Sequence, residues 1–537
     1  MFARGLSLQL VISILLLCSC ARHERPVDAA VRSHTLLLGN LSEPADLDPH
    51  LATAYTDQNI LIGLFEGLTA IDEQTALPVP AVADRWDVST DSLTYTFHLR
   101  PEAKWSNGDP LTARDFAYSF RRILSPALAS EYAYMLWPIK NAEAFNTGKL
   151  ADFGQVGVEV VDDHTLRLNL ERPTPYVLSL AAHPTWFPVH QATIEKFGRI
   201  DQRSTAWTRV GNLVGNGAFR LEEWSPNARI TLAKNPHYWD SAHTQLEHVV
   251  FFPTENPDVE ERDFRAGQTH VTYALPMEKI AGYRDRTPAQ LRRDPFLQTF
   301  FLRFNTTKPP LDNPKVRRAL SLALDRDSIA RNVLRESRLP AHFFTPPNCA
   351  GYTSQASVPT DFSAARKLLE EAGFPGGQGL PAIELQVRND DTQPKVSEAI
   401  QAMWQRELGL RITLSPFEQK TWIQNQQTLN YSIAFSGWVG DFADAATFLD
   451  LFITGGGNNW TGWSHREYDR LLKDASNTVN AADRMKDFQD AEALLLEQAP
   501  IAPLYFGARV YAIHPAVKNW QPALLGFHRY QLVRLEP

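Results

Sequence analysis

The sequence is poor in cysteine and lacks the short motifs that mark common enzymes. Its 537 residues include three cysteines, and no HExxH, GxSxG or GxxxxGK[ST] pattern occurs. The simplest metalloprotease, serine hydrolase and P-loop interpretations therefore lack support. The 15 histidines are scattered, without a compact spacing to cysteines or carboxylates, so we expect no metal and no other cofactor. The missing motifs do not exclude an enzyme, because catalytic sites are built by geometry on unrelated folds.

A basic charge is missing too. The formal net charge is −8, whereas a nucleic-acid-binding protein usually carries a basic face, so we expect no nucleic-acid partner. The 44% hydrophobic and 21% charged residues are ordinary for a globular protein. At about 150 residues per domain, the length predicts about three domains.

The first 20 residues have the pattern of a lipoprotein signal peptide. Arg4 precedes a short apolar stretch, residues 6–17, which is shorter than the about 20 residues needed to span a bilayer. The stretch ends in Leu17-Cys18-Ser19-Cys20, which resembles a lipobox with cleavage before Cys20 and lipid on its sulfur. A plain secretory signal with two incidental cysteines is the alternative. No second long apolar run follows, so we expect a lipid-anchored protein of the periplasm, in a Gram-negative cell, that does not span the membrane.

Cleavage before Cys20 would leave Cys349 as the one free thiol. A single thiol cannot form an intramolecular bridge, so we expect a fold without disulfides. Residues 21–32 are polar and contain a proline, and this composition predicts a flexible tether.

From residue 33 onward, strand and helix patterns alternate. Leu93, Tyr95, Phe97 and Leu99 alternate with polar residues and predict a half-buried strand. Thr112, followed by Asp115, predicts the start of a helix, and Asn313-Pro314 predicts another. Residues 503–506 predict a short apolar strand. The rhythm indicates an α/β fold with helices packed on a mixed sheet.

Five stretches in order resemble the extracytoplasmic solute-binding proteins of family 5, which serve oligopeptide and dipeptide ABC transporters. They are residues 43–50 (EPADLDPH) with 64–68 (LFEGL), 104–108 (KWSNG) with Thr112, Asp115, Phe116 and Tyr118, 215–219 (GNGAF) with 235–239 (NPHYW), 316–320 (VRRAL) with 325–326 (DR), and 437–442 (GWVGDF). Together they cover nearly all of the chain after the signal peptide. Each alone is weak, and five in the family's order form a strong signal.

The resemblance implies a fold like that of periplasmic binding proteins, with two lobes, a hinge and three domains. Residues 1–20 would be the signal peptide and 21–32 the tether. The first lobe would combine residues 33–65, 191–297 and 501–537, with a small inserted domain at 66–190. Residues 298–500 would form the second lobe. The lobes would close on the ligand about the hinge.

The resemblance also implies the binding residues. Family members hold a peptide as an added strand between the lobes, and a carboxylate pairs with the peptide's α-ammonium. Asp441 matches that carboxylate, although it could instead cap the helix that follows. Gly437 and Val439 match positions that pair through main-chain groups, and Trp438 could wall a pocket or pack in the core. Tyr132 and Tyr55 match aromatic contacts of the ligand, or are surface tyrosines.

One departure concerns the carboxylate end of the ligand. Oligopeptide binders of this type carry arginines shortly before the Gly-Trp motif, but residues 426–436 contain no Arg or Lys, and Phe435 stands nearest the motif. Carboxylate capture at that place is therefore in doubt.

The sequence thus predicts a non-enzymatic, monomeric binding protein that delivers oligopeptides or peptide-like solutes to an ABC permease and, through it, to the ATPase. A dipeptide, a cell-wall peptide or a non-peptide solute remains an alternative ligand. An exported lipoprotein hydrolase, or a surface lipoprotein with an adhesive or sensory role, remains an alternative of another class.

Overall fold

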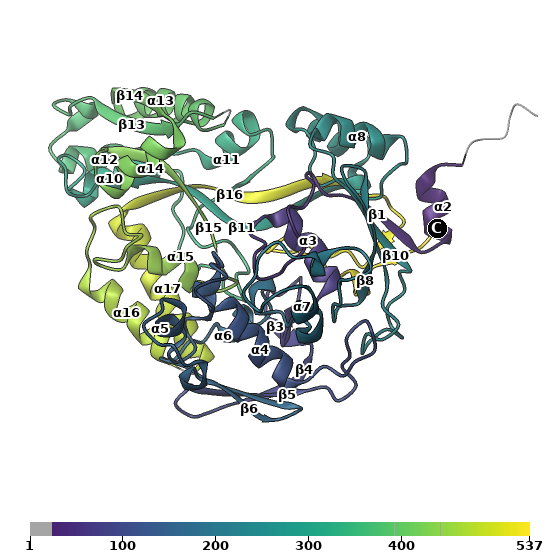
Figure 1. Ribbon diagram of the computed structural model, residues 1–537. Coiled ribbons are helices and arrows are strands. Elements are labelled where there is room, and N and C mark those ends of the chain that lie inside the picture. The colour runs from purple at the N-terminus through teal and green to yellow at the C-terminus, as the bar shows by residue number, and fades with distance from the viewer. Residues whose placement is uncertain (1–23, 391, 441, 479) are drawn as a thin grey trace, which may run out of the picture.

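The computed structural model describes residues 24–390, 392–440, 442–478 and 480–537. They form an α/β fold in which helices cover a six-stranded sheet and two four-stranded sheets (Figure 1).

The first four-stranded sheet has the order β1-β10-β9-β8, with β1 (Thr35–Gly39) parallel to β10 (His248–Phe252). The other two strands, β9 (Arg229–Lys234) and β8 (Phe219–Ser225), are antiparallel. Helix α3 (Tyr55–Leu64) packs on this sheet through Ile60, Leu61 and Leu64, which are fully buried. Three helices belong to the stretch of sequence that also contains β8, β9 and β10: α7 (Gln191–Phe197), α8 (Pro257–Arg265) and α9 (Ile280–Arg286).

The second four-stranded sheet is antiparallel throughout, in the order β4-β5-β7-β6. Its strands are β4 (Ala83–Val88), β5 (Thr94–Leu99), β7 (Thr165–Asn169) and β6 (Val158–Asp162). Strand β5 buries alternate residues, as its sequence predicts. Helix α4 (Ala113–Ile123) begins with a capping box formed by Thr112 and Asp115, which satisfies main-chain N–H groups at the helix start. The short elements β2 (Thr69–Ile71), β3 (Pro78–Pro80), α5 (Ala142–Asn146) and α6 (Val177–Leu180) complete this region.

The six-stranded sheet lies between two helical layers. Its order is β12-β16-β11-β15-β13-β14, formed by Leu339–Pro340, Ile501–Ala512, Leu291–Phe304, Ile433–Val439, Ile383–Arg388 and Ile412–Phe417. Leu302 and Phe304 of β11 face a core with α10 (Pro314–Leu322), α12 (Phe362–Glu371) and α13 (Gln393–Leu408). Phe301 faces the opposite core, with α15 (Ala446–Leu449), α16 (Arg466–Asn477) and α17 (Ala481–Gln498). The remaining elements are α11 (Arg326–Ser328), α14 (Gln419–Gln427), β17 (Val517–Lys518) and β18 (Arg534–Leu535).

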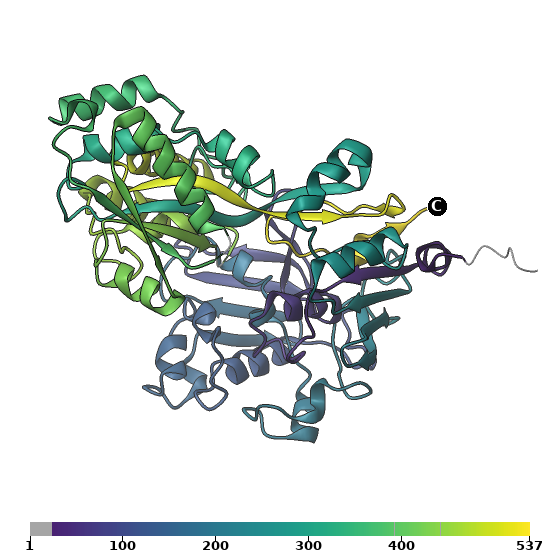
Figure 2. The same cartoon turned by 90° about the horizontal axis from the view of Figure 1, so that it is seen from above.

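Two long antiparallel strands, β11 and β16, run from the six-stranded sheet toward the first four-stranded sheet (Figure 2). Their pairing breaks between Pro295, which faces Ala508, and Thr299, which faces Phe506. The break gives β11 two more residues than β16 and interrupts the ladder, as a β-bulge does. The predicted short strand at residues 503–506 is thus part of a strand of 12 residues.

The predicted tether needs a correction. Residues 26–32 form helix α2 (Pro26–Arg32), and Val27, Ala30 and Val31 on it are buried. Val27 and Ala30 pack against Leu37 and Val250 of the first sheet. An apolar face of three residues in a mainly polar segment is enough to dock this turn of helix, so a flexible segment cannot extend past Arg25.

Within the described ranges, no helix combines the length and the apolar character needed to cross a membrane.

Candidate functional site

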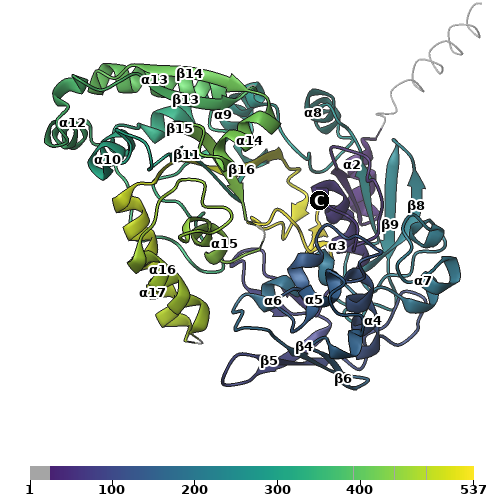
Figure 3. The same ribbon diagram turned by 60° about the vertical axis from the view of Figure 1, so that its left-hand side comes forward.

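A cavity of about 280 Å³ is lined by segments that are distant in the sequence. Figure 3 shows the ribbons of α3, α6, β15 and the C-terminal segment in that part of the molecule. The volume is near the lower end of the range of about 300–1,000 Å³ for small-ligand pockets. Its lining comes from α3 and its start, from the β2–β3 hairpin, from residues 132–135 and 179–187, from the break in β11, from the end of β15 and from the C-terminal loop. The main side chains are Tyr55, Glu66, Glu73, Tyr132, His183, Phe296, Leu297, Val439, Phe442, Phe527, His528 and Arg529.

The structure brings three of the six predicted binding residues to this cavity: Tyr55, Tyr132 and Val439. Trp438 is half-buried and packs against the core under α15–α17, which fits its alternative as a core residue. Gly437 is exposed on β15 and is not part of the cavity lining. Asp441 lies outside the described residues, although its neighbours Gly440 and Phe442 both line the cavity. Cys20 also lies outside them.

Tyr55 stands at the break between the long strands. Its ring stacks on Phe527 at a centroid distance of 4.3 Å and meets Phe296 edge-on at 5.6 Å. Phe296 belongs to the part of β11 whose register is broken. The Tyr55 hydroxyl is buried without a hydrogen-bond partner among the described residues, and burial raises its pKa. A buried tyrosine hydroxyl usually has a polar partner, so this group is suited to one supplied by a ligand.

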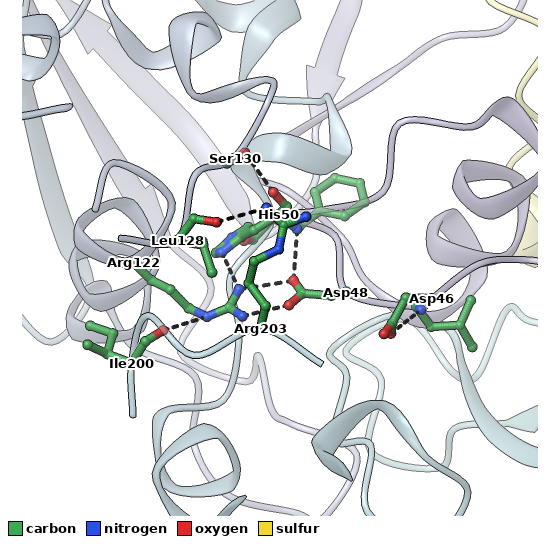
Figure 4. Close-up of polar contacts among 10 residues, drawn as sticks. Asp46, Asp48, His50, Arg122, Leu128, Ser130, Ile200 and Arg203 are labelled. Atoms are coloured by element: carbon green, nitrogen blue, oxygen red, sulfur yellow. Dashed lines mark hydrogen bonds and ion pairs between the residues drawn. The ribbon is translucent and has the colours of Figure 1, made fainter. Parts of the chain in front are cut away.

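Buried charges hold the loop that carries Tyr132 (Figure 4). Arg122 of α4 donates to both carboxylate oxygens of Asp48, at 3.0 and 2.6 Å. Ser130, two residues before Tyr132, donates to the carbonyl of His50 at 2.7 Å. Arg203 donates to the carbonyls of Leu128 and Ala129. The motif at residues 43–50 therefore supports one wall of the cavity without lining it.

The neighbours of His50 keep its imidazole neutral. Arg122 can only donate, so Nδ1 of His50, at 2.9 Å, must accept. The proton therefore sits on Nε2, which donates to the carbonyl of Phe187 at 3.0 Å. Burial, and then the charge of Arg122, lower the pKa of His50 to about 4.

The end of β15 leaves one main-chain edge unpaired. On one side β13 pairs with Ile433 and Ala434, and no described strand pairs with β15 beyond them. On the other side β11 follows β15 to Val439, and Gly440 N–H donates to the carbonyl of Leu297. Because alternate residues of an antiparallel strand point their main-chain groups to the same side, Trp438 faces β11 with Gly440. The N–H and C=O groups of Gly437 and Val439 then point to the open edge.

The loop after β15 is fixed on both sides of residue 441. Asp444 accepts two hydrogen bonds from Arg484 of α17, at 2.7 and 2.8 Å, and one from the N–H of Ala446. Phe442 stacks on Tyr176, which precedes α6, at a centroid distance of 4.1 Å and an interplanar angle of 11°. This stack joins the segment before α6 to the loop after β15.

Several lining residues were not predicted as site residues. Glu66 belongs to a quoted motif, and Tyr238 and Trp239 of another quoted motif donate to its two oxygens at 2.6 and 2.7 Å. Burial raises the pKa of Glu66. Burial lowers the pKa of His183 to about 4. Phe527 and Arg529 come from a C-terminal loop without periodicity, so no local pattern could have placed them here.

Comparison with known proteins identifies the family. The model for bacterial extracellular solute-binding proteins, family 5 (middle region), matches residues 78–460. The chain belongs to this family. The likeness extends beyond the matched region, because relatives align over most of the chain.

Three curated relatives illustrate the range of the family. The periplasmic oligopeptide-binding protein OppA of Salmonella typhimurium is 34% identical over 90% of this chain and 89% of its own length. The periplasmic murein peptide-binding protein MppA of Escherichia coli is 36% identical over 89% and 88%. The probable deoxycholate-binding periplasmic protein YgiS of Escherichia coli is 34% identical over 91% and 89%.

The solved structures that match differ in how well they superpose. An unliganded open form of the murein tripeptide-binding protein MppA matches with a TM-score of 0.87, at 34% identity over 94% of this chain and 97% of that one. The Haemophilus influenzae OppA in complex with the peptide RPPGFSPFR matches with a TM-score of 0.68, at 31% identity over 94% and 99%. The fold is thus that of the periplasmic binding proteins, in an arrangement nearer to the open form.

Proposed function

We propose that this family 5 protein is the solute-binding component of an ABC importer, and that it carries oligopeptides or peptide-like solutes to the permease. The observation that carries the proposal is the cavity itself, which joins the unpaired edge of β15 at Val439 to aromatic side chains on the other side. An extended peptide can add to such an edge through main-chain hydrogen bonds, which bind without reading the sequence.

The break between β11 and β16 is the hinge in this proposal. Residues 33–65, 191–297 and 501–537 form one lobe with 66–190 inserted, and 298–500 form the other. The similarity to an unliganded open form, at a TM-score of 0.87, supports a resting state in which the lobes are apart. Closure would bring the open edge of β15 and the Tyr132 wall onto the ligand.

The lipid anchor belongs to the same proposal. We infer that Cys20 is the mature N-terminus and carries the lipid that keeps the protein at a membrane facing the periplasm. Radiolabelled palmitate should enter the full-length protein and not the Cys20→Ser variant. Labelling of both proteins would refute this part.

Native mass spectrometry of freshly purified protein, followed by calorimetry with di- to pentapeptides, tests the binding function. We expect either a co-purified peptide in the mass spectrum or binding of added free peptides with a Kd in the micromolar range or lower. A wild-type protein that binds none of these peptides would refute peptide transport. Binding of deoxycholate instead would favour a non-peptide solute, as the name of YgiS suggests for that relative.

Incubation of the protein with a mixture of peptides distinguishes a binding protein from a hydrolase. We expect the mass spectrum of a peptide mixture to stay unchanged after prolonged incubation with the protein. Cleavage products that depend on the folded protein would revive the exported hydrolase.

A further inference from the structure

The two carboxylates of the cavity already have partners. Glu66 accepts from Tyr238 and Trp239, one on each oxygen. Glu73 accepts from the main-chain N–H of Arg529 at 2.6 Å, and its other oxygen lies 3.2 Å from Nδ1 of His528. Neither carboxylate is paired with an arginine or lysine side chain among the described residues.

Arg529 is in the opposite situation. It is the one lysine or arginine among the described residues that line the cavity. Its Nε is buried and has no hydrogen-bond partner, and no ion pair of its guanidinium occurs within the described ranges. A guanidinium stays charged and carries five N–H donors. The charge of Arg529 acts on the nearby carboxylates of Glu66 and Asp72 without a direct ion pair, so its unpartnered N–H is available to a ligand.

The main chain holds Arg529 in this position independently of its side chain. Its N–H is fixed by Glu73, which comes from the β2–β3 hairpin. Phe527, two residues earlier, is fixed by the stack with Tyr55. The side chain is therefore presented to the cavity by a loop that is tied at both residues.

We propose that Arg529 binds a carboxylate of the ligand. This rests on the proposed binding function and adds the group that was missing from residues 426–436. A planar guanidinium matches a carboxylate with two parallel hydrogen bonds. Glu66 and Glu73 line the same cavity, and their negative charge favours a monoanion over a phosphate dianion. The carboxylate is either the C-terminus of a peptide or an acidic side chain.

The placement has a consequence for closure. Arg529 belongs to the C-terminal loop, whereas Gly440 and Phe442, on either side of the predicted amine partner, belong to the loop after β15. Both loops line one cavity. A ligand with an amine at one end and a carboxylate at the other would then connect the two lobes electrostatically.

Calorimetry with matched peptides tests the proposal. The probes are Ala-Ala-Ala, its C-terminal amide and Ala-Glu-Ala amide, measured on the wild type, Arg529→Met and Arg529→Lys. We expect the wild type to prefer at least one carboxylate form over the tripeptide amide by tenfold or more, and Arg529→Met to lose that preference. Preference for Ala-Ala-Ala identifies the C-terminus as the source, and preference for Ala-Glu-Ala amide identifies the side chain.

Arg534→Met is the control, because Arg534 is an exposed arginine of the same C-terminal segment; it should keep the wild-type preference. The ratio of acid to amide affinity within one protein does not depend on how much of that protein is folded. Arg529→Lys keeps a positive charge, so it should retain part of the preference for the carboxylate form. An unchanged ratio in Arg529→Met would overturn the carboxylate site and leave peptide binding intact. Failure of the wild type to bind any probe would overturn peptide binding and this site together.

Discussion

Individual buried charges hold the loops around the cavity. The Arg122–Asp48 and Arg484–Asp444 pairs are almost fully buried, and removing one partner of such a pair typically costs about 3–5 kcal/mol because the other charge is left unpaired. These residues do not line the main cavity. Their role is to position Tyr132 and the loop after β15.

At residue 441 we expect a change in binding with no change in fold. Asp441→Asn should weaken binding of a free-amine peptide by tenfold or more, because an ammonium taken out of water needs an anion. Acetylating the peptide's N-terminus should weaken wild-type binding similarly and leave the variant nearly unaffected. Asp312→Asn, an exposed site in the same lobe, is the control for calorimetry. If Asp441→Asn bound the peptide with unchanged affinity, Asp441 would not be the partner of the peptide's ammonium group.

His50 should make the protein less stable in mild acid. Its pKa is about 4 in the fold against 6.5 for an ordinary histidine, so between these values the unfolded chain binds a proton that the fold excludes. The stabilisation is complete above pH 6.5 and is lost as pH falls toward 4, by up to about 3 kcal/mol.

Urea unfolding at pH 7 and pH 4.5 measures this effect. His50→Gln should show a smaller loss of unfolding free energy between the two pH values than the wild type. His243→Gln should behave as the wild type, because His243 is 83% exposed. Equal pH dependence in all three proteins would show that His50 does not carry the effect.

At the scale of elements, capped helices and alternating strands were predictable. Thr112 with Asp115, and Asn313 with Pro314, begin helices where the sequence predicts them, since both signals act within one turn. Strand β11 was missed because Pro295 interrupts it, and β16 was found only at residues 503–506. Their pairing is non-local and is stabilised by the assembled sheet, which no local pattern records.

The glycine opposite the break in β11 should be sensitive to substitution. A Cβ at Gly507 would lie 2.8 Å from Cβ and Oε1 of Gln298, so Gly507→Ala should lower the free energy of unfolding by about 1–3 kcal/mol. Gly457→Ala is the matched control, because nothing lies within 4 Å of its Cβ, and it should stay within about 0.5 kcal/mol. Equal unfolding midpoints for the two variants would mean that the break absorbs the extra atom.

For the whole molecule, the resemblance gave the fold class and three of the cavity residues. It could not give Glu66 as a lining residue, or Phe527 and Arg529, because these meet only when the β2–β3 hairpin and the C-terminal loop fold against α3. In the sequence alone, Glu66, Phe527 and Arg529 are each equally compatible with an ordinary core or surface position. Distant segments make up this site, so their signal exists only in the assembled structure.

Closure should be a rigid-body motion, because separate hydrophobic cores lie under the first sheet, under the inserted sheet and on each face of the six-stranded sheet. The ladder between the two strands that connect the lobes is interrupted at the break, where Leu297 is buried in the core under α15–α17 and should move with that core. Saturating peptide should therefore lower the radius of gyration in small-angle X-ray scattering while the far-UV circular dichroism stays the same.

At 100 times Kd the peptide should also stabilise the fold by about 2.7 kcal/mol. Asp441→Asn should show a smaller decrease in radius of gyration than the wild type at a peptide concentration near the wild-type Kd, because its affinity is expected to be weaker by tenfold or more. A radius of gyration that stays constant while calorimetry reports binding would mean that the ligand is held by one lobe alone, and the break between β11 and β16 would then not be a hinge for binding.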